Sequence, residues 1–122
     1  MKQYKALSIL APYGENIANG KKTLEIRKWK PDQLPLNDVV IIQNNIKLSE
    51  AITEDPDGKA VALVDIVKVE SWRADQQHQA CALFYEEGWL AWQITNIRKI
   101  YSKNKIKAAR KIYEINCEIK LI

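Results

Sequence analysis

The sequence is poor in the residues that bind metals or cross-link small proteins. Among its 122 residues there are two cysteines, Cys81 and Cys117, and one histidine, His78. The cysteines lie far apart, and neither has a second Cys or His at the spacing of a zinc site, so we expect two reduced thiols. His78 lies in a polar stretch without a neighbouring ligand, which favours a surface position over a role as ligand or base. The sequence therefore predicts no metal site and no cofactor.

The chain also lacks long apolar segments and glycine-rich loops. Its first ten residues contain too short an apolar run for a signal peptide, and no window approaches the roughly 18 apolar residues of a membrane span. There is no phosphate-binding glycine loop, dinucleotide fingerprint or G-x-S-x-G motif, which argues against classical nucleotide hydrolysis and dehydrogenase chemistry. We expect a cytoplasmic protein that does not contact membranes.

The residues that are present fit one compact domain over residues 1–122. The chain is 47% hydrophobic, enough for a useful core, and no repeat or linker divides it. A formal net charge of +4 and a pI near 9.0 favour an anionic partner without requiring one.

Residue patterns predict an α+β fold, a mixed β-barrel of about six strands with two or three short helices. The first helix follows Pro12 and ends at Gly20, which suits the position after a helix end. Expected strands cover residues 4–10, 22–29, 39–43, 60–72, 90–101 and 110–119, and a second helix covers residues 80–87. Residues 44–58 should form a polar surface excursion ending in a D-P-D-G turn. Whether this excursion covers a cleft as a lid is left open.

The segment from Gly20 to Trp29 carries the richest set of polar groups. The period of two in this strand places a mixed set of side chains on the face opposite the core, namely Thr23, Glu25, Arg27 and Trp29. Together with Lys21 and Lys22 at the preceding turn, they can engage a phosphate, a carbonyl or the edge of a base. A Lys beside a Glu could also exchange protons. The alternative is a surface Glu25–Arg27 pair that stabilises an edge strand.

A second candidate site is a basic stripe near the C-terminus. It comprises seven basic residues with no acid among them: Arg98, Lys99, Lys103, Lys105, Lys107, Arg110 and Lys111. Such a stripe, flanked by Tyr101 and Tyr113, can neutralise RNA phosphates while the aromatic rings stack on bases. The alternative is a solvated loop and an edge strand protected by lysines.

The tryptophans and one acidic pair complete the candidates. Trp92 is expected in the core with Ile94, and Trp89 is a further core candidate. Trp29 and Trp72 could each line a pocket mouth or pack in the core. Glu86 and Glu87 precede Gly88, where they could cap a helix end or offer a carboxylate to the cleft.

Three motifs together resemble the ASCH domain family of the PUA-like superfamily. They are L-S-I-x-x-P-Y at residues 7–13, I-x-x-G-K-K-T-x-E-I-R at residues 17–27 and D-G-K-A-V-A-L-V-D-I at residues 57–66; A-W-x-I-T-N-I-R-K-I at residues 91–100 is similar to the family's late strand. The resemblance implies a PUA-like barrel whose cleft, beside the first helix, is proposed to bind RNA. Ligand-binding residues would be Ser8, Tyr13, Lys21, Arg27 and Trp29.

The resemblance also implies a possible enzymatic role. One branch of the family removes the acetyl group of N4-acetylcytidine with a lysine, a threonine and a downstream glutamate. The lysine corresponds to Lys22 and the glutamate to Glu87 or Glu86, but the nucleophilic threonine falls on Glu25. A carboxylate cannot form the same acyl-threonine intermediate, which leaves attack by a water molecule. Another branch is described as cleaving RNA, and eukaryotic relatives act as transcriptional coactivator modules.

Three hypotheses follow for this chain. The first is a module that binds RNA or a nucleoside-like ligand in the cleft. The second is a small hydrolase acting on a modified nucleoside or on RNA, with Lys22, Glu25 and Glu87 as its catalytic residues. The third is a protein-interaction domain without a nucleic-acid ligand. The oligomeric state is left open.

Overall fold

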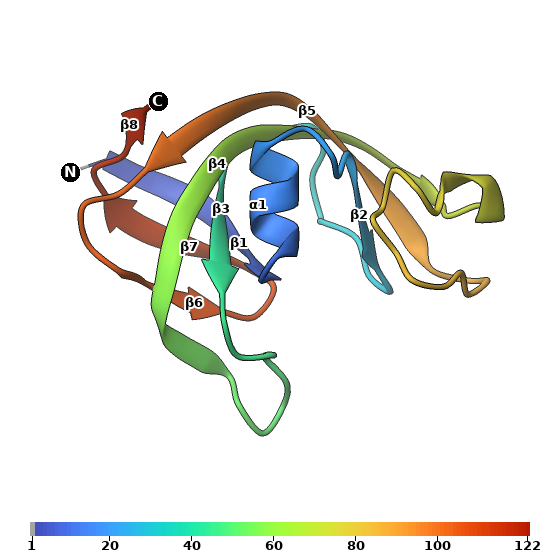
Figure 1. The fold of residues 1–122 in the computed structure, drawn as a ribbon, viewed down its shortest axis with the longest axis horizontal. Helices are drawn as coiled ribbons and strands as arrows, with labels where there is room; N and C mark the ends of the chain where they lie inside the picture. The colour runs from blue at the N-terminus through green and yellow to red at the C-terminus, as the bar shows by residue number, and fades with distance from the viewer. Residues whose placement is uncertain (1) are drawn as a thin grey trace.

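The computed structural model describes residues 2–122 as a mixed sheet with one α-helix and one turn of 3₁₀ helix (Figure 1). Its elements in chain order are β1 (Lys2–Leu10), α1 (Tyr13–Ala18), β2 (Leu24–Arg27), β3 (Leu36–Asn44), β4 (Glu54–Ser71), η1 (Ala74–Gln76), β5 (Leu90–Tyr101), β6 (Ile106–Ala109), β7 (Ile112–Cys117) and β8 (Lys120–Leu121). The strand order is β2-β5-β4-β3-β1-β7, while β6 pairs with β4 and β8 with β5. β1 and β3 are parallel, and the other pairs are antiparallel. The expected mixed, mostly-strand fold is therefore present.

The sheet is open, so the expectation of a closed barrel is not confirmed. β2 pairs only with β5, and β7 pairs only with β1, which leaves these two strands at the ends of the order in the described part of the chain. The long strands β4 and β5 bend over α1 in Figure 1. The sheet is therefore curved like part of a barrel, but β2 and β7 at its two ends do not pair with each other. One cavity, described below, is lined by residues at the end of β2 and by residues between β6 and β7.

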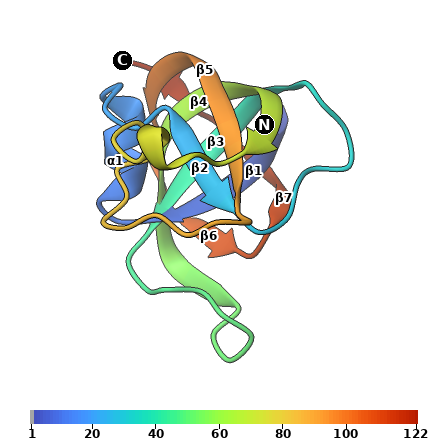
Figure 2. The same ribbon diagram turned by 90° about the vertical axis from the view of Figure 1, so that its right-hand side faces the viewer.

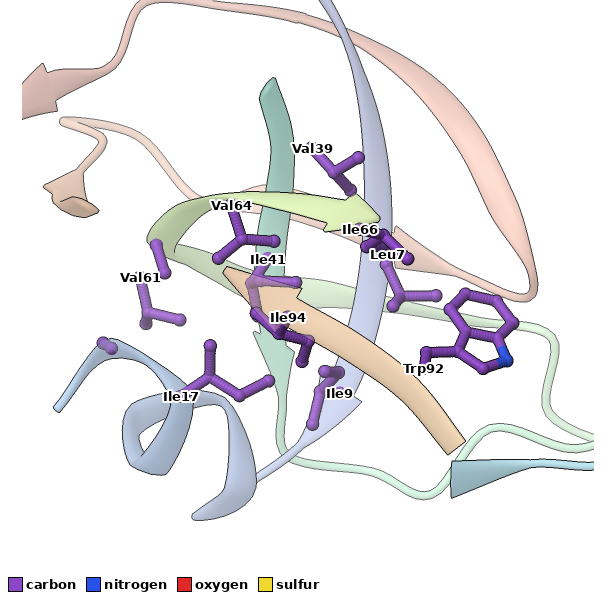
Figure 3. Close-up of a cluster of buried hydrophobic side chains, with 12 residues drawn as sticks. Leu7, Ile9, Ile17, Val39, Ile41, Val61, Val64, Ile66, Trp92 and Ile94 are labelled. Carbon is purple, nitrogen blue, oxygen red and sulfur yellow. The ribbon is translucent and has the colours of Figure 1, made fainter. Parts of the chain in front are cut away.

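The main core lies between α1 and the concave side of the sheet. Figure 3 shows Ile17 of α1 facing Ile9, Ile41 and Ile94 of three different strands. Ile17 and Ile41 are fully buried. A smaller apolar cluster holds residues 72–89 against β2 and β5, and its buried members are Leu24, Trp72, Ala80 and Ala91.

The helix expected over residues 80–87 does not form, and the expected helix count is not confirmed. After η1, residues 77–89 run as turns and irregular backbone, crossing beside β2 in Figure 2. Leu83 and Phe84 are exposed there, at 87% and 63%. The loop is held by the tertiary contact from the Tyr85 hydroxyl to the Trp72 carbonyl (3.0 Å). Contacts to neighbouring segments thus override the local preference for helix.

The D-P-D-G segment is part of strand β4, so the expected turn is wrong. Its register with β6 shifts between Asp55 and Gly58, which marks a β-bulge. Asp55 is buried and accepts hydrogen bonds from the backbone N–H groups of Asn45, Ile46 and Asp57. The sequence predicts an exposed turn here. The buried Asp55 carboxylate instead holds the backbone of Asn45 and Ile46 in the preceding loop.

The C-terminal strand expected over residues 110–119 is present as β7, which is shorter and pairs with β1, whereas β6 before it pairs with β4. β6 and β7 are separated by Arg110 and Lys111, and Lys111 has a φ of +61°. The strand at residues 90–101 has the expected bounds. Two free thiols are present, as expected, and His78 is exposed. No helix in the described residues is long and apolar enough to cross a membrane.

Candidate nucleotide-binding cleft

The polar cluster of β2 lies inside the protein. Lys22 and Glu25 are 5% and 7% exposed, and Nζ of Lys22 lies 3.2 Å from Oε1 of Glu25. Nζ also donates to the carbonyl of Ala80 at 2.6 Å and lies 5.7 Å from the centre of the Tyr13 ring. Lys22 therefore ties β2 to the loop that follows η1.

Arg27 completes this cluster from the other side of Glu25. Its Nε and Nη2 donate to Oε2 of Glu25 at 3.0 and 2.7 Å, and Nη2 also donates to the Ser8 carbonyl at 2.9 Å. The pairing of Glu25 with Arg27 was an open alternative, and it is present. Its expected surface location is wrong, because the Glu25 side chain is only 9% exposed.

Glu25 is held in its ionised form by these partners. Burial alone would raise the pKa of this carboxyl, but the charges of Arg27 and Lys22, and the hydrogen bonds that both donate, bring the pKa below its ordinary value of 4.5. Glu25 is therefore a carboxylate at neutral pH, able to accept a hydrogen bond or a proton.

The cluster forms one wall of a cavity of about 400 Å³, which we call the aromatic cavity. Its other walls include the rings of Tyr13, Trp72, Phe84 and Trp89. Trp72 is buried, and its indole N–H has no hydrogen-bond partner among residues 2–122. The lining of the cavity thus combines aromatic side chains with a charged cluster.

A second cavity of about 300 Å³, which we call the basic cavity, lies next to the first. Four cationic residues line it, Arg27, Lys47, Arg110 and Lys111, and no carboxylate does. Leu10, Arg27 and Lys47 line both cavities, so the two form neighbouring compartments of one cleft. The loop expected as a possible lid supplies Lys47 to this cleft.

The structure brings together some of the expected ligand-binding residues and separates others. Ser8, Arg27 and Trp29 line the basic cavity, while Tyr13 lines the aromatic one. Lys21 is exposed beside His78 and lines neither cavity, but the hollow that holds it shares Cys81 and Ala82 with the aromatic cavity. Glu86 and Glu87 are also exposed and line neither cavity.

The residues of the basic stripe are likewise split between the cleft and other parts of the surface. Only Arg110 and Lys111 line the cleft. Arg98 pairs with Asp38 and Asp65, and the remaining paired members are Lys105, with Asp57, and Lys107, with Glu54. Lys99 and Lys103 lie beside other surface hollows. The stripe contains no acid in sequence, but strand pairing brings acids of β4 beside it.

Trp72 was an open candidate for a pocket wall, and it lines the aromatic cavity. Sequence reasoning missed Lys47 and the exposed ring of Phe84. Lys47 lies in a polar loop without a motif, although the Asp55 carboxylate of the D-P-D-G segment accepts hydrogen bonds from the backbone just before it. No three His, Cys, Asp or Glu side chains are grouped for a metal ion within residues 2–122.

Comparison with known families decides the classification. The model of the ASCH domain matches residues 7–104. The chain belongs to the ASCH domain family. Solved structures similar to this ASCH domain include two mutant forms of ZmASCH from Zymomonas mobilis. No curated protein matches the chain.

The likeness to ZmASCH concerns the fold alone. One crystal structure superposes with a TM-score of 0.50 at 17% identity, covering 80% of this ASCH domain and 70% of that chain. The other gives a TM-score of 0.49 at 15% identity, covering 81% and 73%. The first of these shows that this ASCH domain shares its fold with a solved ASCH protein.

Proposed function

We propose that this ASCH domain binds RNA or a nucleoside-like ligand, with a base held in the aromatic cavity. The observation that carries the proposal is the aromatic cavity itself, in which four aromatic residues and a buried charged cluster line one space of about 400 Å³. Pockets for small ligands typically measure about 300–1,000 Å³ and combine apolar walls with a few placed polar groups.

The chemistry of the walls suits a base. Aromatic rings stack on the flat faces of bases, which contributes about 1–3 kcal/mol per base in single-strand recognition. The carboxylate of Glu25 accepts hydrogen bonds from amino groups, and the guanidinium of Arg27 donates to carbonyl oxygens. Lys22 is already held by Glu25 and Ala80, so we assign it mainly to positioning.

The test is the binding of a short fluorescein-labelled single-stranded RNA, measured by fluorescence anisotropy. We expect Phe84→Ala and Trp89→Ala each to weaken binding by about 5- to 100-fold, because each removes a stacking surface. Tyr101→Ala is the matched control, since Tyr101 is an aromatic residue that is 47% exposed and lies outside both cavities. Equal losses in all three variants, or no binding by the wild type, would contradict the proposal.

A second candidate function is hydrolysis of a modified nucleoside or of RNA. The buried contact of Lys22 with Glu25 favours it, because an ionised carboxylate in a cavity can take a proton from an attacking water molecule. Arg27 and Lys22 would stabilise the developing negative charge. Since Glu87 lines neither cavity, we assign the proton transfer to Glu25.

This candidate is tested by turnover of N4-acetylcytidine and of a labelled RNA, with wild type, Glu25→Gln and Lys22→Met. We expect a true hydrolase to lose at least about 100-fold in rate with Glu25→Gln. Circular dichroism checks that each variant is folded. Turnover that survives Glu25→Gln would refute this assignment.

A further inference from the structure

We propose that the basic cavity is a phosphate subsite, which holds a phosphate group attached to the nucleoside whose base occupies the aromatic cavity. The inference rests on the proposed function and narrows it. The preferred ligand would then be a nucleotide or an RNA strand, and a free nucleoside would be a poor one.

The first argument is the charge of the basic cavity. The charge of Arg27 is partly balanced by Glu25, whereas Lys47, Arg110 and Lys111 form no ion pair within the described residues. Three unbalanced cations therefore converge on one hollow, in addition to the guanidinium. A phosphate, with several acceptor oxygens and up to two negative charges, complements such a set.

The second argument is the contrast within one short segment, residues 105–111. Lys105 and Lys107 lie just before and within β6, and each pairs with a carboxylate of β4 at 3.0 and 2.8 Å. Arg110 and Lys111, in the link between β6 and β7, have no carboxylate partner in the part of the chain that the structure describes. Within this segment, charge is neutralised along β6 and left unbalanced beside the cavity.

The third argument is that the link between β6 and β7 is held in place. The backbone N–H of Ala109 donates to Oγ of Ser8 at 3.2 Å, and the same oxygen lies 2.7 Å from the Tyr113 hydroxyl. Lys111 has a left-handed φ of +61°, and its Nζ lies 5.5 Å from the centre of the Trp29 ring. A backbone conformation unfavourable for lysine is thus held by contacts on both sides. The backbone that carries Arg110 and Lys111 is therefore positioned beside the cavity.

The fourth argument is that the compartments are continuous. Leu10, Arg27 and Lys47 line both cavities, so a base and its phosphate can lie on either side of Arg27.

The test compares the four ribonucleosides with their 5′- and 3′-monophosphates by NMR titration of the wild-type protein. We expect at least one monophosphate series to bind at least about tenfold more tightly than the nucleosides, as charge-assisted hydrogen bonds predict. Its resonance shifts should include the amides of Arg110 and Lys111. In the double variant Arg110→Gln/Lys111→Gln, the advantage of the phosphate should fall below about threefold, with nucleoside affinity within about twofold of wild type.

The control is the double variant Lys105→Gln/Lys107→Gln, which removes the same charge from the same segment outside the cavity. It should keep the advantage of the phosphate. Equal effects of both double variants, or no advantage in the wild type, would overturn the phosphate subsite. If inorganic phosphate shifts the Arg110 and Lys111 amides while no nucleoside or nucleotide binds, the subsite stands as an anion site and the proposed function fails. If neither phosphate nor nucleotides bind, both fail.

Discussion

Lys22 and Glu25 meet inside the protein, with 3.2 Å between Nζ and Oε1 and with both side chains more than nine-tenths buried. A buried charge that loses its partner is costly, by about 3–5 kcal/mol in other proteins. The two residues are nevertheless not equivalent, because Glu25 also pairs with Arg27. This asymmetry gives the first prediction.

We expect Glu25→Gln to lower the free energy of unfolding by about 3 kcal/mol, because it leaves two cations beside a neutral amide. Lys22→Met should cost less, since Glu25 keeps its two hydrogen bonds from Arg27. Urea unfolding monitored by tryptophan fluorescence measures both values. A larger loss for Lys22→Met would mean that the contact with Ala80, rather than the charge of Glu25, controls this region.

Stability should decrease on acidification. Glu25 has its pKa lowered by Arg27 and Lys22 against the effect of burial, and Asp55 has its pKa lowered first by the backbone N–H of Asp57 and then by that of Asn45. The pKa of Asp65 is lowered by hydrogen bonds from Asn96 and from the backbone of Asp38. Because folding lowers these pKa values, the ionised groups stabilise the protein above the ordinary values of 3.8 and 4.5.

This stabilisation is lost as the pH falls through the lower pKa values of the folded state. We expect the urea midpoint to be constant near neutral pH and to fall below about pH 4.5. Glu25→Gln should flatten the profile, since the variant has no carboxyl to protonate at this site. A profile of Glu25→Gln that falls as steeply as that of the wild type would show that other groups control acid unfolding.

Two buried tryptophans provide a matched pair of substitutions. The indole N–H of Trp92 donates to the Trp29 carbonyl at 3.0 Å, whereas that of Trp72 has no partner among residues 2–122. Both substitutions to phenylalanine shorten the same ring system, but only Trp92→Phe leaves an acceptor without its donor. We expect Trp92→Phe to be less stable than Trp72→Phe by about 1–3 kcal/mol in urea unfolding. Equal losses would argue against this hydrogen bond.

Gly58 should tolerate no side chain. A Cβ at this position would collide with the backbone oxygen of Ile106 and lie 2.7 Å from Cγ2 of Ile42. Gly58→Ala should therefore separate β6 from β4 and lower the melting temperature strongly. Gly20→Ala is the control, because Gly20 has a φ of +77° but open space around it, so we expect a cost of only about 1 kcal/mol. Similar melting temperatures for the two variants would contradict the close packing of the β4 bulge.

The affinity for RNA should fall as the salt concentration rises, with a slope set by only a few cationic side chains. If the three unpaired cations of the basic cavity contact phosphates, the slope of log K against log salt should be about −2 for single-stranded RNA. Arg110→Gln should reduce its magnitude by about 0.7. Arg98→Gln should leave it unchanged, because Arg98 is paired with Asp38 and Asp65. Equal slopes for the two variants would indicate that Arg98 also contacts phosphates and that the whole basic stripe is the binding surface.

The sequence predicts well where local pattern and tertiary environment agree. The strand at residues 90–101 is rich in β-branched and aromatic residues, and its bounds are correct. Pro12 precedes α1 and Gly20 follows its end, as their backbone preferences indicate. The helix prediction for residues 80–87 fails because Lys22, distant in sequence, donates to the Ala80 carbonyl, and because the Tyr85 side chain is held by the Trp72 carbonyl outside the loop.

The candidate site was predictable in part for the same reason. The G-K-K-T-x-E-x-R string located Lys22, Glu25 and Arg27, but alternation could not reveal that this strand has a cavity, rather than solvent, beside its polar face. The division of the basic stripe depended on carboxylates about 50 residues away, which strand pairing brings close. Lys47 carried no local signal at all.

Arg27 lines both compartments of the cleft and also forms an ion pair with the Glu25 carboxylate. A ligand that reorients its guanidinium in one compartment therefore changes the donors offered in the other. The two halves of a nucleotide should consequently be recognised with a coupling free energy, so that their separate affinities do not simply add. A fragment screen that tests bases and phosphates one at a time would then understate what the intact molecule can achieve.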